Sequence, residues 1–200
     1  MKGYRAVPFE GVEIPAVGWV RFGETMDQID RRLSAHVCAR TEMYDTMGIH
    51  CEFDGGLSIA VCSLGPPWRC EAIGFSDAVM HPPVVGDCRL AGPTMRSAAE
   101  CLVRAGYQPW GPTGPIEDLV YACRPDDDAT PTPDDSIYFH EIGVVLWTDL
   151  QSEEGGVELG ELRLGTVMLF RRGYLEALNA KYFVQGKPHL VVALPPSPSS

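Results

Sequence analysis

Two pairs of a histidine and a carboxylate are the residues whose types and spacing could perform acid–base chemistry. His50 and Glu52 are two positions apart in an alternating run, so on a strand they share one face. His140 and Glu141 are adjacent at the end of a second apolar run. A histidine beside a carboxylate can act as a general acid or base, or bind a metal ion. The favoured interpretation is a solvated sheet face without a catalytic role, and the alternative is that these four residues form a catalytic site.

Sequence motifs of other catalytic or cofactor-binding sites are missing from the chain. It has no HExxH, CxxC, GxSxG, P-loop or GxGxxG pattern, and no serine triad can be built from the spacing. We therefore expect no metal centre and no cofactor. Sites assembled from residues far apart in the sequence carry no such motif, so an enzyme is not excluded.

Four aromatic side chains point to protein binding. Trp68 follows two prolines in a turn, and Trp110 lies between a proline and a glycine, while Tyr138 and Trp147 lie in predicted strands. Exposed Trp and Tyr beside acidic segments are typical anchors for a partner protein. We take these four residues as candidate partner-binding residues. The alternative is that they cap the hydrophobic core beneath loops.

The elements that must position these side chains begin with a sequence that occurs twice. Residues 17–26 and 85–95 both read Val-Gly-x-x-Arg-hydrophobic, then Gly, then Thr-Met. Each Thr-Met opens an apolar pattern with helical spacing, in which Thr25 and Thr94 are N-cap candidates. The spacing predicts helices over 25–34 and 94–105.

A group of strands follows each predicted helix. An Asp-Gly turn joins the alternating runs 49–53 and 57–62, which is a strong hairpin signal. A second hairpin is predicted over 137–140 and 144–148, and third strands over 70–75 and within 157–170. Hairpins instead of crossover helices connect these strands, so we expect mostly antiparallel sheets.

The predicted fold class is α+β, with two similar helix-plus-antiparallel-sheet units in tandem forming one compact domain. The first unit spans residues 1–83 and the second 84–172. Within the second, residues 124–135 are rich in Asp and Pro and predict a mobile acidic loop. Residues 173–200 are expected to form a short helix, a final strand near 189–194 and a Pro/Ser tail.

The motif at the start of each predicted helix is similar to a known repeat. Val20-Arg21-Phe22-Gly23-Glu24-Thr25-Met26 and Cys88-Arg89-Leu90-Ala91-Gly92-Pro93-Thr94-Met95 resemble the repeat of the beta-lactamase inhibitory protein family and of the related small outer-membrane assembly lipoprotein domain. The resemblance covers roughly residues 17–80 and 85–170. In this chain Met follows Thr, whereas it precedes Thr in those families. The resemblance implies a tandem helix-plus-sheet architecture and an inhibitor-like, protein-binding role.

The charge of the chain limits its partners. The net charge is −11, and residues 105–162 hold 13 acidic residues against a single basic one, Arg124. Nucleic acids and anionic membrane surfaces need a basic surface, so we expect neither as a partner. The acidity favours a basic protein partner, and a small-molecule ligand stays open. Arginine exceeds lysine 13 to 3, which is compatible with a GC-rich bacterial genome.

The cysteines and the apolar runs indicate in which compartment of the cell the protein is found. Seven cysteines without a CxxC pair, in a chain without an export signal, predict reduced thiols in a cytoplasmic protein. Most would serve as small core hydrophobes. No apolar run approaches the roughly 18 residues of a membrane-spanning helix. The seven are Cys38, Cys51, Cys62, Cys70, Cys88, Cys101 and Cys123.

Two functions of different classes fit these observations. The first is a non-catalytic protein-binding module, an inhibitor or immunity-type protein that presents an acidic, aromatic sheet face to a partner. The second is a small cytosolic enzyme or ligand-binding protein of specialised metabolism that uses the His/carboxylate residues. The first is favoured by the acidic segment, the lack of catalytic motifs and the resemblance to an inhibitor repeat.

Overall fold

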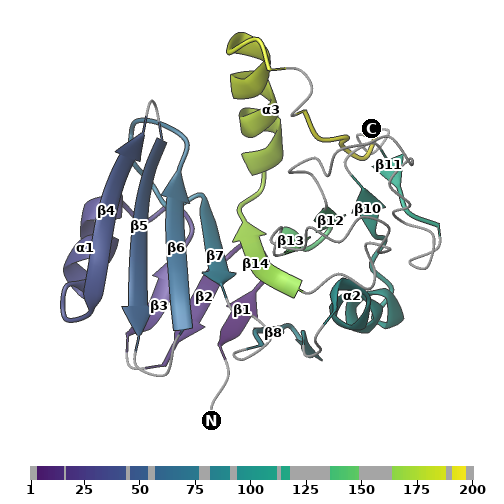
Figure 1. Cartoon of the computed structure of the whole chain (residues 1–200), viewed down its shortest axis with the longest axis horizontal. Coiled ribbons are helices and arrows are strands. Elements are labelled where there is room, and N and C mark those ends of the chain that lie inside the picture. The colour runs from purple at the N-terminus through teal and green to yellow at the C-terminus, as the bar shows by residue number, and fades with distance from the viewer. Residues whose placement is uncertain are drawn as a thin grey trace.

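Figure 1 shows the computed structural model, in which two β-sheets and three helices are described. The structure describes residues 4–15, 17–43, 46–53, 57–76, 82–90, 94–111, 114–117, 136–148, 164–187 and 191–196. The helices are α1 (Met26–Leu33), α2 (Met95–Arg104) and α3 (Tyr174–Val184). No helix among these residues is long and apolar enough to cross a membrane.

The larger sheet has nine strands, all antiparallel to their neighbours, in the order β11-β10-β12-β13-β14-β7-β6-β5-β4. Hairpins therefore build each side, and β7 and β14 meet in the middle. The strands are β4 (Val37–Met43), β5 (Thr46–Phe53), β6 (Leu57–Ser63), β7 (Ala72–Ser76), β10 (Trp110–Gly111), β11 (Gly114–Pro115), β12 (Ser136–Phe139), β13 (Val144–Thr148) and β14 (Leu164–Phe170).

The smaller sheet has five strands in the order β3-β2-β1-β8-β9. They are β1 (Arg5–Val7), β2 (Gly11–Ile14), β3 (Gly18–Arg21), β8 (Val84–Val85) and β9 (Cys88–Arg89). The pair β1–β8 is parallel, and the other pairs are antiparallel. In Figure 1, β1, β2 and β3 lie behind the nine-stranded sheet.

The main core lies between the two sheets and includes one face of α1 and one face of α2. Side chains alternate across a strand, so every second residue of β5, β6 and β7 points into this core. Ile29 of α1, Leu102 of α2 and Phe75 of β7 are all 0% exposed. The expected packing of both helices on one side of the larger sheet is therefore confirmed.

The opposite, outer face of the larger sheet is covered over part of its width. Tyr174 and Leu175 of α3 pack there against Phe170 and Met168 of β14 in a second apolar cluster. The C-terminal segment 191–196 joins this cluster through Val192. Over β5 the same face carries the exposed polar residues His50 and Glu52, so this part of the outer face is solvated. Figure 1 shows α3 rising beyond the end of the sheet.

Both predicted helices and both predicted hairpins are confirmed. Thr25 and Thr94 each form a capping box with the residue three positions on, Gln28 and Ser97. The predicted hairpins correspond to β5–β6 and β12–β13. The third strands are β7 and, within the predicted 157–170, β14. These elements carry strong local signals, namely a cap or a turn next to a periodic apolar run.

Strands β1, β2, β4, β10 and β11 were not predicted, and one predicted strand is absent. β1 and β2 precede the repeated motif, and β4 lies between the first helix and its hairpin. Residues 191–196 are not a strand, because the Asn179 side chain binds the Val192 N–H and C=O at 2.9 and 2.8 Å in place of a neighbouring strand. The predicted acidic loop 124–135 lies outside the described residues.

The expectation that all cysteines are reduced is wrong for one pair. Cys38 and Cys51 form a disulfide across β4 and β5. The antiparallel register places the two residues directly opposite each other, with their Cα atoms 4.1 Å apart. A core role fits Cys70 and Cys88, which are buried free thiols. Spacing along the chain does not reveal register, which is why the pair was missed.

Candidate functional site

Strand β3 exposes a tryptophan and an arginine on the outward face of the smaller sheet. Alternation buries Val20 in the core, at 0% exposure, and turns its neighbours Trp19 and Arg21 to the opposite face. The Arg21 guanidinium carbon lies 5.0 Å from the centre of the Trp19 ring, which is a cation–π contact. Gly11 of β2 lies opposite Arg21, and its φ of 144° and the nearby Val20 carbonyl leave no room for a Cβ. The close pairing of β2 and β3 therefore requires this glycine.

Trp19 differs from the other three tryptophans of the chain. Trp68 packs against the main core, and Trp110 and Trp147 pack against the second cluster. Within the described residues, Trp19 packs against neither core although it is half-buried. Its ring is therefore not needed to fill the interior.

Two more exposed arginines lie on the same face as Trp19. Arg5 of β1 is opposite Glu13 of β2, which is opposite Trp19, and Arg89 of β9 is opposite Val84 beside Arg5. We call Arg5, Trp19, Arg21 and Arg89 the Trp19 face. The ion pairs found among the described residues include none of its three arginines. Their guanidinium donors are thus available to another molecule.

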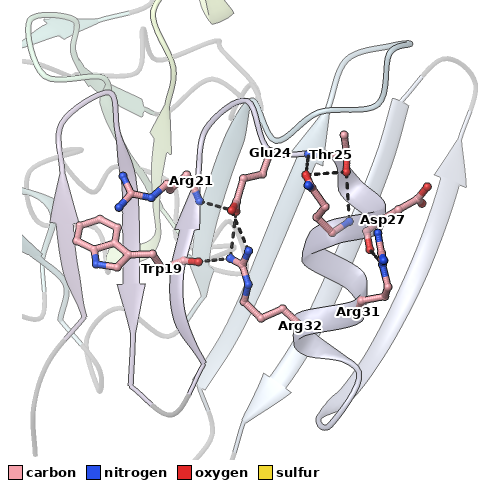
Figure 2. Close-up of polar contacts among 8 residues, drawn as sticks. Trp19, Arg21, Glu24, Thr25, Asp27, Arg31 and Arg32 are labelled. Atoms are coloured by element: carbon pink, nitrogen blue, oxygen red, sulfur yellow. Dashed lines mark hydrogen bonds and ion pairs between the residues drawn. The ribbon is translucent and has the colours of Figure 1, made fainter.

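Side chains of the β3–α1 junction occupy the free edge of β3, as Figure 2 shows. Glu24 Oε2 accepts a hydrogen bond of 3.0 Å from the Arg21 backbone N–H. Arg32 of α1 donates to the Trp19 carbonyl through Nη1 and to Glu24 Oε1 through Nη2, at 2.8 Å. The Glu24–Arg32 ion pair therefore satisfies the groups that a further strand would bind. It also fixes the backbone of both Trp19 and Arg21.

The electrostatics of this junction favour the ionised pair. Partial burial by itself raises the pKa of the Glu24 carboxyl, but hydrogen bonds from Arg32 and from the Arg21 N–H outweigh it, so the net pKa is lowered. The hydrogen bond to Glu24 raises the pKa of Arg32. The lowered pKa of Glu24 and the raised pKa of Arg32 both favour the charged forms, so the two side chains form an ion pair at neutral pH.

Helix α1 brings Arg32 to β3, and hydrogen bonds fix both its first turn and its last turn. The capping box fixes the first turn at Thr25, directly after Glu24, and Gln28 Oε1 accepts from the Thr25 N–H at 3.0 Å. Arg31 Nε donates to the Asp27 carbonyl at 3.1 Å. Arg32 is in the last turn and lies on the side that faces β3 (Figure 2).

The four predicted partner-binding aromatics do not form one surface. Trp68 belongs to the main core, on the inner side of the larger sheet. Trp110, Tyr138 and Trp147 lie on the outer face and pack in the second cluster, where Tyr138 is only 5% exposed. Their contacts fit the alternative interpretation, in which these aromatic side chains cap the hydrophobic core. Of the 13 acidic residues in 105–162, only Glu117 and Glu141 are described, so the expected acidic face lies mostly outside the described residues.

The four predicted catalytic residues form two separate pairs. His50 and Glu52 share the exposed outer face of β5, and His50 Nε2 lies 2.7 Å from Ser58 Oγ on β6. His140 and Glu141 follow β12, and Glu141 accepts from the Gln108 N–H at 3.0 Å. β5 and β12 are five strand positions apart, roughly 24 Å along the sheet. The structure therefore does not bring the two pairs together.

His140 lies in an aromatic environment beside the second cluster. Its ring stacks on Tyr138 with centroids 5.8 Å apart and meets the edge of Trp110 at 5.4 Å. Nε2 is buried and has no hydrogen-bond partner among the described residues. Burial lowers the pKa of His140, and the nearby Glu176 opposes this in part. The neutral imidazole is the form that fits this site.

Among the described residues, no group of three or more His, Cys, Asp or Glu side chains is placed to hold a metal ion. No protein-family model, curated protein or solved structure matches the chain. Support for a function therefore comes from the chain's own geometry.

The residue that the sequence reasoning missed is Trp19. Its signal was present in Gly18-Trp19-Val20-Arg21, where alternation puts Trp19 on the same face as a charged Arg21. A tryptophan on the charged face of a short strand is a stronger indication of exposure than a tryptophan in a proline turn.

Proposed function

We propose that the chain is a non-catalytic protein-binding module, of the inhibitor or immunity type, that docks its partner on the Trp19 face. The observation that carries the proposal is Trp19, stacked with Arg21 on an outward sheet face and used by neither core. Trp and Arg are enriched among the residues that dominate interface energies. Because the Glu24–Arg32 pair already holds their backbone, little order has to be gained on binding.

The proposed partner is a basic protein. The net charge of −11 attracts such a protein over long distances and speeds encounter at low salt. Because the Trp19 face itself carries three arginines, the patch of the partner that meets it would present carboxylates or backbone carbonyls to Arg5, Arg21 and Arg89, although the partner's net charge is basic. Trp19 would supply the apolar anchor.

The proposal includes a duplicated architecture of two tandem units. In the smaller sheet, β2 and β3 lie on one side of β1, and β8 and β9 lie on the other. In the larger sheet, β6, β5 and β4 extend from β7, while β13, β12 and β10 extend from β14. Each unit then runs from a two-stranded hairpin through a Thr-capped helix into an antiparallel group.

An inhibitor or immunity role in the cytoplasm is the specific form of this proposal. Support for the inhibitor role is the resemblance of 20–26 and 88–95 to the beta-lactamase inhibitory protein repeat. The cytoplasmic location is only a proposal. The Cys38–Cys51 disulfide counts against it, because disulfides persist in oxidising compartments and are rare in the cytosol. A count of free thiols in freshly isolated protein tests this location.

The test is affinity capture from source lysate with matched variants. We expect one basic protein to be retained at low salt by the native chain and by the Arg104→Ala control. Trp19→Ala should weaken its retention by about thirtyfold, the effect of removing an interface hot spot. Equal retention by the Trp19→Ala variant, with its fold intact by circular dichroism, would contradict the proposal.

One contact favours a second candidate function. Ser58 Oγ and His50 Nε2 are 2.7 Å apart, the spacing of a nucleophile and its general base. On this alternative the chain is a small hydrolase with its site on the open outer face of β5 and β6. A fluorophosphonate probe should then label Ser58 in the native chain and not in His50→Ala. An unlabelled native chain would remove this alternative.

A further inference from the structure

Among the residues that the structure describes, strand β4 is the long open edge of the larger sheet. It has seven residues and one hydrogen-bonded neighbour, β5, with an unbroken register from Val37 to Met43. The other three sheet edges are protected: the Glu24–Arg32 pair covers β3, and β9 and β11 have two residues each. A long, regular edge without proline is a template for pairing with another strand.

The distance between paired Cα atoms of β4 and β5 shows which backbone groups of β4 face away from β5. The Cα atoms of Cys38 and Cys51 are 4.1 Å apart, the close spacing of a pair that does not exchange backbone hydrogen bonds. The N–H and C=O of Cys38 therefore point away from β5. By alternation, those of residues 40 and 42 also point to the open edge.

The sequence of β4 is complementary to itself in one antiparallel register. Pairing centred on residue 40 would oppose two arginines, and pairing centred on residue 42 would oppose two glutamates. Pairing centred on Thr41 places Arg40 of each copy opposite Glu42 of the other. In this register residues 40 and 42 are also the pair whose backbone groups meet. Opposite charges directly across an antiparallel pair are stabilising, and like charges are destabilising.

We propose that two copies of this chain associate through β4, with Thr41 on the two-fold axis and the two large sheets joined into one. The Cys38–Cys51 disulfide ties β4 to β5, so the edge is held in place for pairing. Arg40 already binds Asp27 and Asp30 of α1, at 3.3 and 3.7 Å, which holds its side chain on the α1 side of the strand. The Trp19 face lies on the other sheet, so this inference is independent of the proposed function.

The test is the oligomeric state of the purified chain, measured by sedimentation velocity over a wide concentration range. The native chain should show a reversible monomer–dimer equilibrium. Glu42→Arg should weaken association by about tenfold, because two cross-strand pairs change from opposite to like charge. The exchange Arg40→Glu with Glu42→Arg should restore association relative to Arg40→Glu alone. Both of these variants lose the bond to α1, so their difference reports the contact between copies.

A backbone variant and a control complete the test. Glu42→Pro should abolish the dimer but leave the β4–β5 ladder intact, because the N–H at that position points away from β5. Arg104→Glu, on the exposed side of α2, should leave the dimer unchanged. Thermal unfolding confirms that each variant is folded. A native chain that stays monomeric throughout, or a dimer that persists in folded Glu42→Pro, would overturn the inference.

Discussion

The carboxylate of Glu24 joins three parts of the molecule. It accepts from the Arg21 backbone in β3 and from both Nη atoms of Arg32 in α1, and it directly precedes the helix cap. Its side chain is about a quarter exposed, at 23%. Hydrogen bonds to charged groups that are shielded in this way contribute more than those of an exposed ion pair. Glu24 is therefore the residue on which the position of Trp19 depends.

Glu24→Gln should lower the free energy of unfolding by about 1–2 kcal/mol, because the ion pair and one hydrogen bond are lost. Urea denaturation at neutral pH measures this. The pKa of Glu24 is lowered by folding, so its stabilisation is complete above the usual carboxyl pKa and disappears as the pH falls through the lowered value. The difference between native and Glu24→Gln should therefore vanish in acid.

Glu100→Gln is the matched control, because Glu100 forms an exposed ion pair with Arg104 within α2. It should cost at most about 0.5 kcal/mol. A loss as large as that of Glu24→Gln would show that the β3 edge has no special role.

His140 makes the chain less stable in mildly acidic solution. Burial lowers its pKa in the folded state, so the unfolded chain binds the proton more readily. The folded state therefore loses stability as the pH falls below the usual histidine pKa toward the lowered one. Urea denaturation at several pH values between neutral and mildly acidic should show a smaller decline for His140→Phe than for the native chain. Equal declines would show that His140 titrates normally.

At the scale of elements, local signals were sufficient for α1, α2 and both hairpins. The Thr caps and the turn between β5 and β6 specify where these elements begin and end. β1, β2 and β4 carry no such signal, because charges, prolines or glycines interrupt their short apolar patterns. Which strands pair, and in which register, depends on contacts between distant residues. The sequence therefore predicted the fold class, while the Cys38–Cys51 pair and the Trp19 face required the structure.

Thr25→Ala should destabilise the chain by about 1 kcal/mol, because the Gln28 N–H loses its cap acceptor. Thr25→Ser keeps the hydroxyl and should stay within a few tenths of the native value. Urea denaturation with circular dichroism distinguishes the two. An alanine variant as stable as the serine variant would mean that tertiary packing alone sets the start of α1.

At the scale of the whole molecule, the disulfide and the cellular location are linked. Ellman titration of the denatured chain without reductant should find five thiols, because two of the seven cysteines are joined. Closing a loop of this size contributes roughly 3 kcal/mol, so Cys38→Ser should lower stability by about that amount. Seven thiols in freshly isolated protein would mean that the bond is reduced in the cell, as expected of a cytoplasmic protein.

The central claim is that the partner docks on the Trp19 face and not on the outer face of the larger sheet. A photo-crosslinking amino acid at the exposed position 13, directly opposite Trp19 on the same face, can test this in source lysate, with position 50 on the outer face and position 103 of α2 for comparison. We expect one specific adduct from position 13 that the unlabelled native chain competes away, and none from positions 50 and 103. An adduct from position 50 with none from position 13 would contradict the claim.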